Sequence, residues 1–116
     1  MRKIIYIKVY GVLLDLRICK DIKRSVRAVC KKKNLEIGLE DNFGGMVLPL
    51  DINNYILFLS SDYVDYDTLF HEIYHCTRFI GESRFIKDEE SFAWLQGYIG
   101  NEIMKCLKDK VNIRIS

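Results

Sequence analysis

The chain has 116 residues, a net charge of +2 and 49% hydrophobic residues. This length predicts one domain over residues 1–116, and this hydrophobic content is typical of a packed globule and excludes a disordered chain. The small net charge by itself indicates neither nucleic-acid nor membrane binding, and no apolar run approaches the ~20 residues that cross a bilayer. Lys8, Asp15 and Arg17 interrupt the apolar N-terminal segment, so we expect a cytoplasmic protein that is not exported.

The four cysteines form no C-x-x-C pair. They are Cys19, Cys30, Cys76 and Cys106, and their spacing suggests neither a zinc ribbon nor a redox motif. In a protein that is not exported, we expect them to be reduced and to pack as small hydrophobic side chains.

Residues 3–10 are rich in β-branched and aromatic side chains, which predicts a first strand that ends at Gly11. Residues 14–32 show a helical period, which predicts an amphipathic basic helix. Its apolar positions are Ile18, Ile22, Val26, Val29 and Cys30, and its basic positions are Arg17, Lys20, Arg24, Arg27 and Lys31. A basic stripe over residues 17–33 could bind a phosphate backbone or an acidic partner. We favour a solvated face, because acidic residues elsewhere nearly balance the charge.

Residues 35–60 are expected to complete a small sheet. Residues 35–38 form a candidate short strand, and residues 46–50 and 55–59 are two apolar runs around a turn at 51–54, which predicts a hairpin. Pro49 cannot donate a ladder hydrogen bond, so its strand should lie at an edge or carry a bulge. An exposed edge strand of this kind could hold an extended peptide by backbone pairing.

Two further helices follow. The first covers residues 67–80, with Asp65 or Asp67 as N-cap and Gly81 as the residue after its end, and the second runs from Asp88, its N-cap, to about Lys108. Residues 111–115 alternate in polarity and could add a strand or fray. The sequence therefore predicts an α+β fold, with a small, mostly antiparallel sheet packed on the N-terminal amphipathic helix and on these two helices.

The first of these two helices contains the run His71-Glu72-Ile73-Tyr74-His75, which has the form H-E-x-x-H. Residues four apart lie on the same helix face, so two imidazoles could converge on one zinc ion while Glu72 stands beside it. The apolar stripe formed by Leu69, Ile73, Cys76 and Ile80 falls nearly opposite both histidines. The histidines thus avoid the core together, which favours a Zn²⁺ site over ordinary packing.

A catalytic zinc site normally has three protein ligands and one water. The chain has no third histidine, and Cys76 belongs to the apolar stripe, which leaves a carboxylate from the last helix. Ala93, Gly97 and Gly100 form a strip of small residues on that helix and would let it approach closely. Glu90 lies along this strip, so we choose Glu90 as the third metal ligand, with Glu89 close behind. The alternative is that both acids only complement the helix dipole.

His71-Glu-Ile-Tyr-His75 followed by Glu90-Ser-Phe-Ala93 resembles the H-E-x-x-H and E-x-x-A pairing of gluzincin-type zinc metallopeptidases in a minimal form. The stretch 88–98 also resembles short, mostly uncharacterised metallopeptidase-like proteins of phages and mobile elements. The resemblance covers residues 44–104. It implies a zincin-like fold with His71, His75 and the carboxylate on zinc and Glu72 as general base. Trp94 stands where the larger peptidases carry Asn or Asp, and the short spacing leaves little room for a substrate-binding subdomain.

These observations predict a zinc-dependent hydrolase of peptide bonds. Glu72 would take a proton from the attacking water and later deliver it to the leaving amine. Tyr74, Arg78 or Tyr98 could stabilise the oxyanion, and the sequence does not rank them. Two alternatives remain open. The chain could keep zinc for structure or recognition and contact nucleic acid or an acidic partner through residues 17–33, or it could be a peptidase-derived protein without metal.

Overall fold

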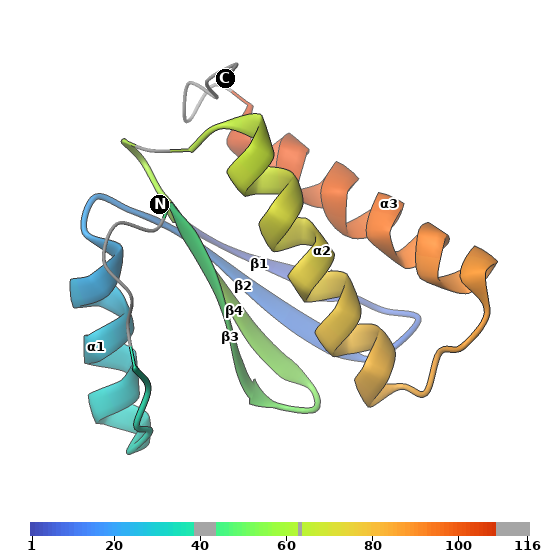
Figure 1. Cartoon of the computed structure of the whole chain (residues 1–116), viewed down its shortest axis with the longest axis horizontal. Coiled ribbons are helices and arrows are strands. Elements are labelled where there is room, and N and C mark those ends of the chain that lie inside the picture. Colours follow the sequence, from blue (N-terminus) through green and yellow to red (C-terminus); the bar gives the residue numbers. More distant parts are fainter. Residues whose placement is uncertain (39–43, 63, 109–116) are drawn as a thin grey trace.

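The computed structural model describes residues 1–38, 44–62 and 64–108. Within these ranges the chain forms four strands and three helices, and together they make the α+β fold that the sequence predicts. The elements are β1 (Arg2–Ile7), β2 (Val12–Cys19), α1 (Ile22–Lys33), β3 (Gly45–Asp51), β4 (Asn54–Ser60), α2 (Tyr66–Ser83) and α3 (Glu89–Leu107). Helix α1 lies on one side of the sheet, and α2 and α3 pack together on the other side (Figure 1).

The strands form one mixed sheet in the order β1-β2-β4-β3. Two antiparallel hairpins, β1–β2 and β3–β4, meet at the centre through a parallel pairing of β2 with β4. Parallel neighbours need a crossover connection, and α1, which lies on one face of the sheet, is part of the connection between the two hairpins. Strands β1 and β3 are the edges.

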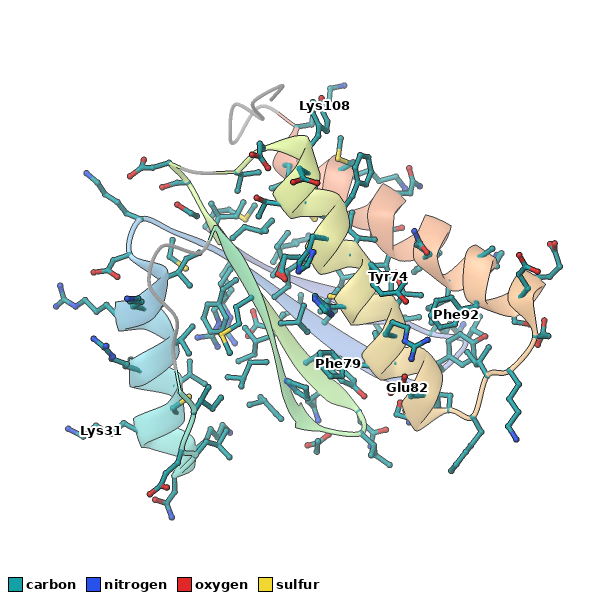
Figure 2. All side chains as sticks on the ribbon, in the orientation of Figure 1. Lys31, Tyr74, Phe79, Glu82, Phe92 and Lys108 are labelled. Atoms are coloured by element: carbon teal, nitrogen blue, oxygen red, sulfur yellow. The ribbon has the colours of Figure 1, made fainter. Side chains whose placement is uncertain are left out.

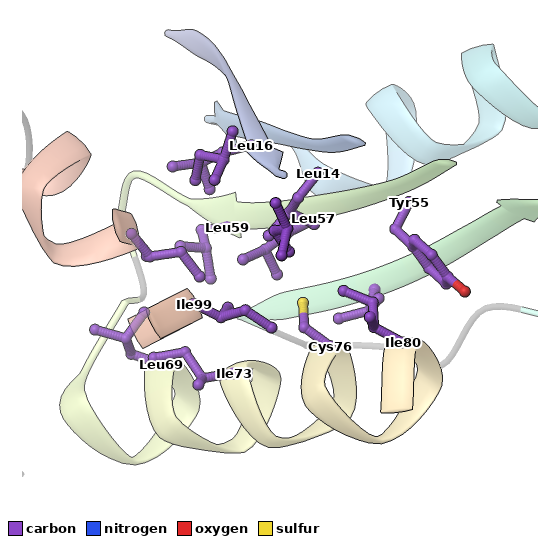
Figure 3. Packing of buried hydrophobic residues seen from close by; sticks show 14 of the residues in the cluster. Leu14, Leu16, Tyr55, Leu57, Leu59, Leu69, Ile73, Cys76, Ile80 and Ile99 are labelled. Carbon is purple, nitrogen blue, oxygen red and sulfur yellow. The ribbon is translucent and has the colours of Figure 1, made fainter. Parts of the chain in front are cut away.

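The main core lies between the sheet and helices α2 and α3. Alternating residues of each strand point into it, as the two-residue period of a strand requires. Leu14, Leu16, Leu57 and Leu59 from the strands meet Leu69, Ile73, Cys76 and Ile80 from α2 and Ile99 from α3 (Figure 3). All nine are at most 2% exposed, so this layer holds α2, and the histidine motif on it, in a set orientation.

A second, smaller core lies under α1. Ile22, Val26 and Cys30 of α1 pack against Leu48 of β3 and against Ile56 and Phe58 of β4. Asp21 caps the start of this helix by accepting a hydrogen bond from the Arg24 N–H at 3.1 Å, and Asn34 ends it in the left-handed conformation. These are the residue types that such positions prefer.

The prediction of one basic helix over residues 14–32 is wrong in its first part. Residues 12–19 form β2, and the helix begins only at Ile22. Leu14, Leu16 and Ile18 alternate into the main core, while Asp15 on the other face forms ion pairs of 2.9 Å with both Arg2 and Arg17. Pairing on both sides with β1 and β4 outweighs the helical spacing of the apolar residues, so Arg17 belongs to the sheet.

Among the other predicted elements, one strand is absent, one helix is longer than predicted and the hairpin is confirmed. Residues 35–38 form no strand, and α2 continues through Gly81 to Ser83. The β3–β4 hairpin is confirmed, and Pro49 lies on an edge strand beside a register shift. The alternating residues 111–115 lie outside the described residues.

The expected helix caps are confirmed. Asp65, rather than Asp67, caps α2 by accepting a hydrogen bond from the Thr68 N–H at 2.6 Å, and Asp88 caps α3 by accepting one from the Ser91 N–H. The four cysteines, all within the described residues, are free. None of the helices in the described ranges is long and apolar enough to span a membrane.

Candidate metal site

Helix α2 brings His71 and His75 together on one turn. Their Nε2 atoms are 3.0 Å apart, and their ring centroids are 4.5 Å apart with an interplanar angle of 79°. Two nitrogens bound to the same tetrahedral zinc lie about 3.4 Å apart. The imidazoles therefore already have nearly the separation that one ion would impose, as the H-E-x-x-H spacing predicts.

Glu72 completes a group of three. The ligand atoms of His71, Glu72 and His75 all lie within 4.8 Å of one another. Glu72 is only 5% exposed, and its Oε2 atom is buried with no hydrogen-bond partner among the described residues. A buried carboxylate oxygen without a partner is costly, and such atoms often face an ion or an ordered water. This oxygen is the strongest sign that the site takes a ligand.

Burial shifts the pKa values of two of these groups. It raises the pKa of Glu72 above its ordinary value, and the nearby His71 charge offsets part of that shift. Burial, followed by repulsion from His71, lowers the pKa of His75. A lowered pKa favours the neutral imidazole, which is the form that binds a metal. The lowered pKa of His75 thus fits a metal-binding group.

The first residue of β3 makes room for Glu72. A Cβ atom on Gly45 would lie 2.7 Å from Glu72 Cγ, a distance that real Cβ atoms essentially never show, and 3.2 Å from Leu59 Cδ2, which is tighter than most Cβ contacts. Glu72 therefore lies between α2 and the beginning of the edge strand β3. The H-E-x-x-H motif did not predict a role for Gly45, which is 27 residues before Glu72. A glycine at the start of a strand is the sequence signal that could have indicated that another side chain packs closely against the backbone there.

The opposite side of α2 is apolar, as predicted. Leu69, Ile73, Cys76 and Ile80 are at most 2% exposed and lie in the main core (Figure 3). Burial raises the pKa of the Cys76 thiol well above its usual range. Cys76 is thus a core residue and not a metal ligand.

The structure does not bring Glu90 to the histidines. Helices α2 and α3 run antiparallel, because Gly81 meets Phe92 and Gly100 meets Ile73. At 1.5 Å per residue, this register places Glu90 beside the end of α2, roughly 12 Å along the helix from His75. Glu90 lies near Val9, Tyr10 and Trp94, and Glu89 beside it is exposed. Ligation by Glu90 stays a prediction.

The strip of small residues on α3 has a narrower role than expected. Gly100 faces Ile73 of α2, with 3.7 Å between the nearest atom of Ile73 and the position of a Cβ. Ala93 and Gly97 are exposed, and nothing lies within 4 Å of a Cβ on Gly97. Only one end of the strip thus contacts α2.

The three candidates for oxyanion stabilisation have different surroundings. The Tyr74 ring lies 6.2 Å from the His75 ring. Arg78 forms an ion pair with Glu82 at 2.6 Å, and Tyr98 stacks on Trp94 at 5.3 Å. Tyr74 is therefore the candidate with a contact to the site. Phe79, which lies outside the H-E-x-x-H motif, stacks on His75 with 6.3 Å between the ring centroids.

No protein-family model, curated protein or solved structure matches this chain. The class of protein is therefore defined by the fold and the site alone. It is an α+β protein with a candidate metal-binding group of two histidines and one glutamate on a single helix, consistent with an H-E-x-x-H motif.

Proposed function

We propose that the chain is a zinc-dependent hydrolase of peptide bonds, with His71 and His75 as zinc ligands. The observation that carries the proposal is the pair of Nε2 atoms 3.0 Å apart beside a buried, partnerless oxygen of Glu72. A bound zinc supplies Lewis acidity, which activates a carbonyl and a water at neutral pH. The donor set and its spacing fit this ion.

Glu72 is the proposed general base. Its carboxylate is next to both imidazoles, and its raised pKa brings it toward the pH at which it works. Glu72 would accept a proton from the attacking water and deliver it to the leaving amine. Gly45 leaves the space that this side chain occupies.

The proposed substrate is an extended peptide. Strand β3 is an edge of the sheet and begins next to Glu72, so a peptide paired with its outer edge would run past the histidines. Pairing of this kind reads the backbone rather than particular side chains. We therefore expect cleavage of unfolded segments rather than of folded domains.

Two assignments of the third protein ligand make different predictions. If Glu90 ligates, as its sequence position suggests, α3 must rearrange against α2, and Glu90→Gln should weaken zinc binding while Glu89→Gln does not. If Glu72 itself ligates, Glu72→Gln should weaken zinc binding, and the proposal of a general base fails. The separate assignment of Glu72 as base predicts that Glu72→Gln keeps zinc and loses hydrolysis.

The test uses the full chain prepared without chelator. We expect about one zinc per chain by elemental analysis and a rise in Tm on adding zinc. His71→Ala should lose both the bound zinc and the rise in Tm. The matched control is Glu82→Gln, an exposed substitution on the same helix, which should keep both. A mixture of fluorogenic peptides then compares hydrolysis by the wild type and Glu72→Gln. A wild type that takes up no zinc, or equal hydrolysis by both proteins, would refute the proposal.

A further inference from the structure

The face of the sheet opposite the metal site is only half covered. Helix α1 packs on β3 and β4, where Leu48, Ile56 and Phe58 are buried. On β1 and β2 the same face exposes Ile4, Tyr6 and Leu13, which are 47%, 53% and 40% exposed. Tyr6 and Leu13 are neighbours in the β1–β2 register. One aromatic and two aliphatic side chains thus form an open apolar floor beside α1.

A cleft of about 610 Å³ lies between α1 and the part of this floor that Ile4 and Leu13 form, and Tyr6 lies beside it as the register neighbour of Leu13. Its lining includes Ile4 and Leu13 from the sheet and four cationic residues, which are Arg2, Arg17, Lys32 and Lys33. Asp15 is the one acidic residue of the lining, and it already forms ion pairs with Arg2 and Arg17 at 2.9 Å. The two lysines from the last turn of α1 therefore add positive charge that this carboxylate does not offset.

The surrounding surface extends this charge. Residues 1–38 contain 11 Lys and Arg and three Asp and Glu, whereas residues 39–116 contain seven and 13. Arg24, Arg27 and Lys31 lie on the exposed part of α1, and Lys31 projects away from the sheet (Figure 2). The positive surface is thus longer than a single small anion needs. A polyanion is the ligand that it fits.

We infer that this cleft and the exposed face of α1 bind single-stranded nucleic acid. Phosphates would contact Lys32 and Lys33 at the cleft and then pass around α1 to Arg27 and Lys31, which line a separate pocket. Unpaired bases would lie on Leu13 and on Tyr6, its neighbour in the β1–β2 register. Proteins that bind single strands combine a positive groove with aromatic side chains on which bases stack, and this face supplies the positive cleft and one exposed ring, Tyr6. A duplex hides its base faces and would leave the apolar floor unused. The inference is independent of the zinc site, which lies across the sheet.

The first test measures binding by fluorescence anisotropy with labelled 20-nucleotide oligo(dT) and oligo(U) at several salt concentrations. The variant Lys32→Glu/Lys33→Glu should weaken binding about tenfold or more and reduce the salt slope by about 1.4. The matched control Lys87→Glu/Lys105→Glu makes the same change in net charge on the acidic part of the chain and should change affinity less than about threefold. Equal losses for both pairs would overturn a site at the cleft.

The second test concerns the floor. Tyr6→Leu removes the ring and should weaken binding about fivefold or more, whereas Tyr6→Phe keeps it and should bind as the wild type does. Phe85→Leu, at an exposed ring on the α2–α3 connection, is the matched control. Preference for one oligonucleotide identifies RNA or DNA as the ligand. Absence of binding of both at ~100 µM protein and low salt overturns the inference. The inference is also overturned if polyglutamate competes with the oligonucleotides as well as unlabelled oligonucleotide does and Tyr6→Leu has no effect on binding. That pair of results would indicate an acidic protein partner.

Discussion

Replacing Gly45 by Ala tests whether β3 positions Glu72. The added Cβ would lie 2.7 Å from Glu72 Cγ and 3.3 Å from Glu72 Cδ. Cγ is in the middle of a buried side chain and cannot simply swing away, so the carboxylate must move or the strand must shift. The backbone at Gly45 does not have positive φ, so Ala itself fits the local conformation and the expected cost is steric.

The magnitude follows from overpacking, which costs roughly 1–3 kcal/mol for an added methyl group in a tight site. For a chain of this size, that corresponds to a fall in Tm of about 4–15 °C. Glu72→Ala removes both Glu72 atoms that the new Cβ would meet and leaves Leu59 Cδ2 at 3.2 Å. In that background Gly45→Ala should cost much less or be neutral, because the closest contact is gone and Ala reduces the entropy of the unfolded chain.

Urea unfolding of the wild type, both single variants and the double variant gives the coupling free energy between the two positions. Gly97→Ala is the matched control, since nothing lies within 4 Å of a Cβ there, and it should stabilise α3 by about 0.5–1 kcal/mol. If Gly45→Ala costs the same with and without the Glu72 side chain, to within about 0.5 kcal/mol, the contact between β3 and Glu72 does not position the carboxylate.

Two further predictions concern the frame around the site. Arg84 donates hydrogen bonds to Tyr10 O, Ile52 O and Asn53 Oδ1 and so joins α2 to both hairpin turns. Arg84→Ala should lower the free energy of unfolding in urea by about 1.5–3 kcal/mol with little recovery in Arg84→Lys, and full recovery by Lys would contradict a role for the planar guanidinium. Asp88 accepts hydrogen bonds from Ser91, which hold its pKa below the ordinary 3.8. Asp88→Ala should therefore lower Tm at neutral pH, and the difference should close as the pH falls below 3.8, because a lowered folded pKa contributes stability only while the carboxylate is charged. A difference in Tm that does not depend on pH would show that the charge is not responsible.

Local signals predicted much of the fold. The β3–β4 hairpin came from two apolar runs around a turn, and Asp65 and Asp88 marked the beginnings of α2 and α3. The placement of Pro49 on an edge strand followed from its missing N–H. These features depend on neighbours in the chain, so a single sequence contains them.

Strand β2 was missed because its evidence is partly non-local. Leu14, Leu16 and Ile18 alternate as a strand requires, yet Ile18, Ile22 and Val26 also show helical spacing, and the longer pattern was preferred. Pairing with β1 and β4 decides between the two, and a single sequence does not show it. The break at Lys20-Asp21 and the capping role of Asp21 were the available local signals.

In the candidate site, too, the features that depend on one helix were predicted and those that depend on packing between elements were not. The His71–His75 pair and the burial of Cys76 follow from one helix and were predicted from spacing. The position of Glu90 depends on how α3 slides along α2, and contacts at Gly81 and Gly100 set that register. The close approach of Gly45, at the start of β3, to Glu72 on α2 joins residues that are 27 positions apart in the sequence. No local sequence pattern encodes such a contact.

The parallel pairing of β2 with β4 has a kinetic consequence. Each hairpin can close early because its strands are neighbours in the chain, but the central ladder joins Leu16 to Leu57, which are 41 residues apart. Closing so long a loop costs entropy before any of its contacts form, and such steps slow folding. The surface on which α2 rests is complete only after this step, so the histidine pair should reach its final support late in folding.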